Sequence, residues 1–149
     1  MDVRAELHAP CEPGALFAWV EDLELYPRWL SIVPSAQPDT PRPGDQGIAW
    51  RIDLRGRIGP VSRSKRLRMV RTRHDPPNVV VFERAEHDGH DHAPWVLRAT
   101  VTPEGDGSKL TMHLHYGGRL WEPIVERMLR DEIEASRGRL LALVGSPAR

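Results

Sequence analysis

The feature that most constrains the fold is the segment from Leu120 to Val144, where apolar residues recur at helical spacing. At about 100° per residue these side chains form one broad stripe, made up of Leu120, Ile124, Val125, Met128, Leu129, Ile133, Leu140 and Leu143. Glu132 falls near the centre of the stripe. Because so broad a stripe must be buried, and the residues before it alternate like strands, we expect one amphipathic helix to close a sheet.

Period-2 alternation of apolar and polar residues predicts the strands of that sheet. It predicts six strands, over 3–7, 48–55, 62–73, 79–86, 95–101 and 110–116, with a seventh over 31–37. Short turns join most of them, so the strands should pair antiparallel. Around 79–84 the phase is ambiguous, and a slip of one residue would exchange the inner and outer faces.

Two short helical segments follow the first strand. Residues 12–22 place apolar side chains on one helical face, with Pro13 tolerated in the first turn. Residues 25–30 form a second, briefer turn that Pro27 interrupts. Helices separate from an antiparallel sheet define the α+β class.

Composition limits the compartment and the partners. With 21 basic and 21 acidic residues, the chain lacks the broad positive field by which nucleic-acid and anionic-membrane binders attract their partners. No window holds the ~18 uncharged apolar residues of a membrane span, and residues 1–9 lack the apolar core of a secretion signal. Cys11 stands alone, which precludes an internal disulfide and suits a reducing compartment. We expect one cytoplasmic domain over residues 1–149.

The beginning of the chain resembles a known family. Residues 8–10, 16–19 and 26–30 read HAP, LFAW and YPRWL, with Asp22 between the last two, and this run resembles the opening of the polyketide cyclase/dehydrase-like family. The order of elements resembles the helix-grip fold of the START-related (SRPBCC) superfamily, to which that family belongs. The resemblance implies a curved antiparallel sheet of six to seven strands wrapped around a long C-terminal helix, with two short helices after the first strand.

The same resemblance implies a function. Members of the superfamily typically hold a lipid, sterol, quinone or polyketide between sheet and helix, and some catalyse cyclisation or dehydration there. We therefore expect this chain to bind a lipid-like, polycyclic or polyketide-like molecule, without a cofactor. An enzyme of the cyclase or dehydratase type is the alternative.

The inner face of the sheet supplies the candidate cavity lining. The residues predicted to contact a ligand are Trp50, Ile52, Leu67, Met69, Arg71, Leu97, Met112, Leu114, Tyr116 and, from the helix, Met128. The methionines would give an adaptable wall. The same side chains could instead fill a solid core, and the resemblance favours the cavity.

Glu132 is the candidate catalytic residue, because a carboxylate among apolar walls should have a raised pKa and could donate or accept a proton. A structural role is the alternative. Arg71 or Arg98 could neutralise it in a buried ion pair, and Ser136 could hydrogen-bond it. The Tyr116 hydroxyl could orient a ligand carbonyl, although an aromatic residue at a strand end often only packs.

Two polar clusters offer other functions. His87, His90 and His92, with Asp88 and Asp91 between them, could bind zinc or nickel. A turn without a positioned second layer of ligands makes a poor metal site, so we assign no metal there. His113 and His115 fall on the outer face of their strand and receive no role.

The second cluster is a basic run that could contact phosphates. It comprises Arg63, Lys65, Arg66, Arg68, Arg71 and Arg73, with Arg55 and Arg57 on the preceding strand. Acids on neighbouring strands, such as Asp53, Glu83 and Glu86, favour a solvated face with cross-strand ion pairs over a nucleic-acid or protein interface. The sequence has no Gly-rich phosphate loop, CxxC pair or HExxH motif, which argues against the common hydrolases and metalloenzymes.

Overall fold

The computed structural model describes residues 1–117 and 122–148. Seven strands form one antiparallel sheet in the order β1-β7-β6-β5-β4-β3-β2. Their bounds are β1 (Asp2–Ala9), β2 (Ser35–Asp39), β3 (Ala49–Ile58), β4 (Val61–Asp75), β5 (Val79–Arg84), β6 (Trp95–Glu104) and β7 (Gly107–Tyr116). The helix α2 (Glu122–Leu143) follows the sheet. The predicted helix-grip architecture is confirmed.

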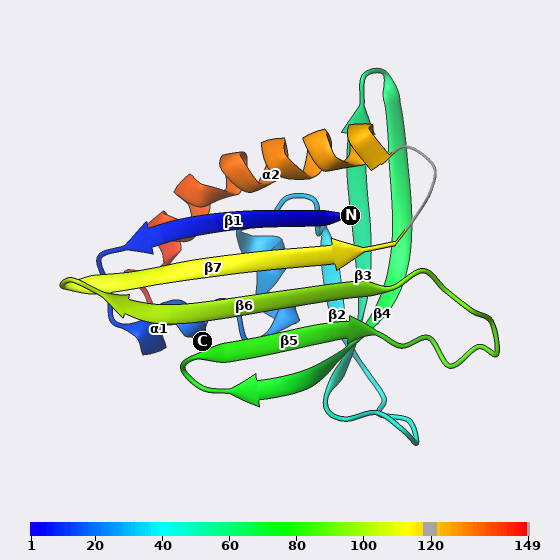
Figure 1. Ribbon diagram of the computed structural model, residues 1–149, viewed down its shortest axis with the longest axis horizontal. Helices are drawn as coiled ribbons and strands as arrows, with labels where there is room; N and C mark the ends of the chain where they lie inside the picture. Colours follow the sequence, from blue (N-terminus) through cyan, green and yellow to red (C-terminus); the bar gives the residue numbers. More distant parts are fainter. Residues whose placement is uncertain (118–121, 149) are drawn as a thin grey trace.

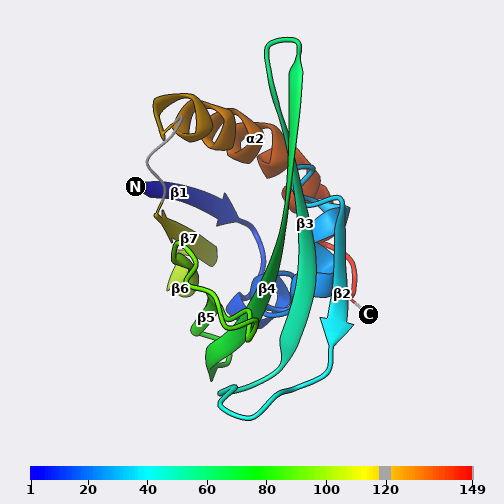
Figure 2. The ribbon, with the colours of Figure 1, turned by 90° about the vertical axis from the view of Figure 1, so that its right-hand side faces the viewer.

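The sheet is strongly curved, and α2 spans its two halves. Figure 1 shows β3 and β4 running across the direction of β1, β7 and β6, and Figure 2 shows α2 lying along the open side of the bend. The helix packs on β1 at one edge and on β3 in the other half. An apolar stripe on a helix can thus face an apolar sheet surface on more than one side. None of the helices in residues 1–117 and 122–148 is long and apolar enough to span a bilayer.

Two short helices precede the second strand, as predicted, but the first is shorter than expected. Helix α1 (Pro13–Phe17) ends well before residue 22, and η1 (Leu23–Arg28) is a 3-10 helix. Two aromatic side chains hydrogen-bond to the chain just after α1. The Tyr26 hydroxyl donates to the carbonyl of Val20 at 2.9 Å, and the Trp29 indole donates to that of Trp19 at 3.2 Å.

The facing of β5, ambiguous from the sequence, is settled by the core. Phe82 lies with its ring edge against Trp50, 5.6 Å between centroids, and against Tyr26, 6.2 Å between centroids. Val80 and Phe82 are both fully buried and face the helices. Val79 is buried as well, so β5 lacks the clean alternation that would have fixed its phase.

Arg68 departs most from the expected exposure. We predicted that it faces solvent, yet its side chain has no exposed surface. Its guanidinium donates five hydrogen bonds of 2.7–3.1 Å, to the carboxylates of Asp39 and Asp45 and to the carbonyls of Thr40 and Ala85. These bonds use all five N–H donors of an arginine, which is the condition for burying its charge. The alternation of β4 is correct, but two loops cover this part of its outer face.

Candidate functional site

A cavity of about 110 Å³ lies between the concave face of the sheet, the segment around η1, and α2. Its lining comprises Val3, Ala5, Leu23, Tyr26, Trp29, Leu30, Ile32, Val33, Ile52, Leu54, Met69, Trp95, Leu97, Met112, Leu114, Leu129, Glu132, Ile133 and Ser136. Apolar and aromatic side chains make up this set except for Glu132 and Ser136. Engineered apolar cavities of about 150 Å³ take up benzene, so the space suits roughly one ring or a short chain.

Six of the predicted site residues lie in this lining. They are Ile52, Met69, Leu97, Met112, Leu114 and Glu132. Their positions follow from strand register, because residues paired across neighbouring strands share a face of the sheet. Leu97 pairs with Leu114, for example, and both reach the cavity.

Three other predicted residues, Trp50, Leu67 and Arg71, lie outside the lining. Leu67 is fully buried. The Trp50 indole donates to the carboxylate of Glu24 at 3.3 Å. Arg71 donates to the backbone carbonyl of Glu21 at 3.0 Å, with its guanidinium 5.7 Å from the Trp50 ring centroid. Arg71 therefore bonds to the chain between α1 and η1. It does not pair with Glu132, the role that the sequence suggested for it.

Tyr116 and Met128 also lie outside the lining. The Tyr116 ring stacks on Trp95 with 4.9 Å between centroids, and its hydroxyl donates to the sulfur of Met1 at 3.3 Å. Met128 packs directly over Gly56 of β3, where a Cβ atom would overlap the methionine sulfur. The glycine thus allows α2 to approach the sheet closely, which a larger residue would prevent.

Glu132 forms part of the cavity wall and is half-buried. Its carboxylate accepts a hydrogen bond from the Ser31 hydroxyl, whose oxygen in turn accepts one from Arg139 at 3.2 Å. The expected partner Ser136 instead donates to the carbonyl of Ile133 in its own helix at 2.8 Å. The carboxylate is therefore held from the segment after η1 and not from the sheet.

The sequence did not predict the part of the cavity lining that lies outside the sheet. Tyr26, Trp29, Leu30, Ile32 and Val33 reach the cavity from η1 and the loop after it. Their loop carries no periodicity that predicts a facing. For Val3, Leu54 and Trp95 a signal did exist, because all three follow the inward alternation of their strands.

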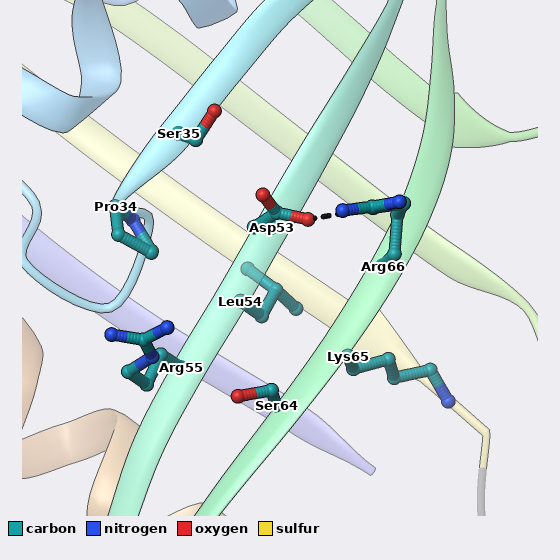
Figure 3. A pocket seen from close by; sticks show the side chains of 8 residues that line it. All are labelled: Pro34, Ser35, Asp53, Leu54, Arg55, Ser64, Lys65 and Arg66. Carbon is teal, nitrogen blue, oxygen red and sulfur yellow. Dashed lines mark hydrogen bonds and ion pairs between the residues drawn. The ribbon is translucent and has the colours of Figure 1, made fainter.

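Another, open hollow of about 400 Å³ lies along the β3–β4 hairpin and the start of β2 (Figure 3). It is lined by Pro34, Ser35, Asp53, Leu54, Arg55, Ser64, Lys65 and Arg66. Arg66 is paired with Asp53 at 2.9 Å across the strands, and Arg51 lies 3.7 Å from Asp39. Arg68 is buried and Arg66 is paired, so these two members of the basic run are engaged within the protein, whereas Arg55, Arg57 and Arg63 are exposed.

Two histidines of the predicted turn, His87 and His92, contact different carboxylates. Nε2 of His87 lies 2.7 Å from Asp45, and Nε2 of His92 lies 2.7 Å from Asp88. Within residues 1–117 and 122–148, no three histidine, cysteine or acidic side chains are arranged to hold a metal ion.

Comparison with known proteins adds to this geometry. Residues 1–145 match the family model described as polyketide cyclase / dehydrase and lipid transport. The chain belongs to this family. The resemblance drawn from residues 8–30 is thereby confirmed, and the match spans the strands, both short helices and α2. The comparison with curated proteins gives no match.

Solved structures similar to this member of the polyketide cyclase / dehydrase and lipid transport family share its fold. A START superfamily protein from Mycobacterium smegmatis has a TM-score of 0.71 at 16% identity, over 97% of both chains. A protein from Chromobacterium violaceum has a TM-score of 0.69 at 13% identity, over 97% of both chains. A major latex-like protein from Panax ginseng has a TM-score of 0.66 at 14% identity, over 95% of both chains.

Proposed function

We propose that this family member binds a hydrophobic small molecule, lipid-like or built on a ring, in the cavity between sheet and α2. One observation supports this most: the cavity is bounded almost wholly by apolar and aromatic side chains. Water gains few hydrogen bonds in such a space, whereas an apolar ligand gains burial. The free thiol of Cys11 suits a reducing compartment, and we propose that the protein works in the cytoplasm.

The cavity volume limits what can be enclosed. One ring or one short chain fits a space of about 110 Å³, whereas a larger molecule must extend through an opening or displace the methionines of the wall. Burying about 200 Å² of apolar ligand surface contributes about 5 kcal/mol before ordering costs. Taken alone, this contribution corresponds to a dissociation constant in the sub-millimolar range, about 0.2 mM.

Binding of n-butylbenzene tests this function. We expect isothermal titration calorimetry to show saturable uptake of one molecule per chain, with an affinity in the range above. The negative heat-capacity change of apolar burial should accompany it. Absence of saturable binding up to the solubility limit of n-butylbenzene would contradict the proposal.

A cyclase or dehydratase is the second candidate, and Glu132 favours it as the carboxylate among the described lining residues. In such an enzyme Glu132 would move a proton on a polyketide-like substrate held against the apolar wall. Glu132→Gln should then lower turnover of a poly-β-keto thioester by about 100-fold or more, with ligand affinity nearly unchanged. An unchanged rate in a variant that still binds the substrate would remove Glu132 from catalysis.

A further inference from the structure

Lys65 places a positive charge beside the cavity. It is paired in register with Leu54, a cavity-lining residue, so the two side chains share the inner face of the β3–β4 hairpin. Its ammonium lies 5.8 Å from the ring centroid of Trp95, which also lines the cavity. The Lys65 side chain is exposed and also borders the hollow of about 400 Å³, where Figure 3 shows it extending away from Arg55 and Ser64.

The Lys65–Trp95 contact spans a break in the sheet. Strand β4 pairs with β5 from Met69 to Asp75, and the carbonyl of Arg68 accepts from the N–H of Ala85, so the part of β4 from Val61 to Leu67 is paired with β3 alone. Trp95 begins β6, on the other side of this break. The lysine and the indole thus meet across a place where none of the described strands forms a backbone ladder that closes the wall of the cavity.

The Trp95 indole N–H is buried and has no hydrogen-bond partner within the part of the chain that the structure describes. Trp19 and Arg137 carry the other two such atoms there, and neither residue lines the cavity. An unpaired buried donor loses its hydrogen bond to water without replacement. In a native structure such a donor is commonly satisfied by water or by a ligand.

The charges around Lys65 leave this place electropositive. Arg84 is nearly buried and donates to Glu86 at 2.8 Å, while Glu86 also accepts from the backbone N–H of Arg68 at 3.1 Å. The one nearby carboxylate is thus already engaged by two donors. Burial, assisted by the charge of Arg84, lowers the pKa of Lys65. An ammonium beside a second cation gains from the approach of an anion.

We propose that the ligand is an amphipathic carboxylic acid, with its ring or chain in the cavity and its carboxylate bound by Lys65 and the Trp95 N–H. This inference rests on the proposed function and specifies its ligand class. The two donors select an acceptor group at one end of the ligand, and the lysine charge selects an anion. Because the cavity encloses roughly one ring, the acidic end has to lie towards its boundary.

Three matched probes test the ligand class: 4-phenylbutyrate, its neutral amide 4-phenylbutyramide, and n-butylbenzene. At neutral pH and low salt, calorimetry should show the acid binding about tenfold or more tightly than the amide. Both should bind more tightly than the hydrocarbon, because n-butylbenzene offers no acceptor to the indole. Equal affinity for acid and amide would overturn the assignment of a carboxylate.

Two substitutions test the Lys65 ammonium and the Trp95 N–H separately. Lys65→Met should weaken 4-phenylbutyrate about tenfold and leave 4-phenylbutyramide within twofold. Trp95→Phe keeps an aromatic ring but removes the N–H, so it should weaken acid and amide alike, by about fivefold, and leave n-butylbenzene unchanged. Lys109→Met is the matched control, because Lys109 pairs with Glu6 at 3.5 Å on the outer face and should change none of the affinities.

Lysine acylation of the unsubstituted protein gives an independent measurement if a variant fails to fold. Lys65 and Lys109 are the two lysines of the sequence. Saturating 4-phenylbutyrate should slow acetylation of Lys65 severalfold without changing that of Lys109, and equal rates with and without the acid would contradict the contact. Failure of all three probes to bind would refute the cavity function itself, whereas binding without preference for the acid would refute this inference alone.

Discussion

Replacing Arg68 by methionine is expected to lower the free energy of unfolding by about 3 kcal/mol. The variant leaves the carboxylates of Asp39 and Asp45 without the guanidinium that both contact, and it removes the donors to two loop carbonyls. Uncompensated buried charges are among the most destabilising changes in a fold. Urea unfolding followed by circular dichroism measures the loss.

Arg66→Met is the matched control. Arg66 lies two residues away on the same face of β4, and its exposed side chain pairs with Asp53. An exposed pair contributes little because water screens it. If the two substitutions destabilised the protein equally, the Arg68 cluster would not have the structural role described above.

The contribution of the Arg68 cluster to the stability of the protein should also depend on pH. The hydrogen bonds from Arg68 hold the pKa of Asp45 well below its usual value. A lowered folded-state pKa stabilises the protein above the unfolded pKa of about 4, and that contribution is lost as the pH falls below this value. Arg68→Met removes the cause, so the stability difference between variant and parent should narrow on acidification.

Ala5→Phe is expected to abolish uptake of n-butylbenzene, with at least about a 100-fold loss of affinity. Ala5 lines the cavity from β1 and pairs with Met112, another lining residue, so an added phenyl ring would occupy the space that the ligand needs. Stability should change by no more than about 1–3 kcal/mol, because the ring fills existing volume but is not tailored to it. Calorimetry with n-butylbenzene measures the affinity.

The matched control is Ala135→Phe, on the exposed side of α2. It adds the same ring where solvent accommodates it and should leave n-butylbenzene affinity within twofold. Unimpaired binding by a folded Ala5→Phe variant would show that the ligand site lies elsewhere.

The fold was largely predictable because the periodic pattern of the sheet is regular. The alternation in β3, β6 and β7 gave the correct inner faces, and the stripe on the last helix required a sheet to cover it. The apolar run Val79–Phe82 did not reveal its facing, which depended on the contacts of Phe82 with Trp50 and Tyr26. The stripe residues Leu120, Ile124 and Val125 fall outside the described residues or side chains.

The cavity lining was predictable only in part. Alternation assigns a side chain to a face, but it does not say where along that face a neighbouring element leaves space. Trp50, Leu67 and Met69 all face inwards, yet of these three only Met69 reaches the cavity. Trp50 packs instead on Phe82 and donates to Glu24. The burial of Arg68 was unpredictable for a similar reason, since it depends on where two irregular loops lie.

The most direct test of an apolar ligand site uses the four methionines, labelled with ¹³C at their methyl groups. Met69 and Met112 line the cavity, whereas Met1 and Met128 do not, so each spectrum contains its own control. On titration with n-butylbenzene, the Met69 and Met112 methyl signals should shift in a saturable manner, and those of Met1 and Met128 should move much less. Four signals that stay in place up to the solubility limit of n-butylbenzene would contradict a ligand site beneath α2.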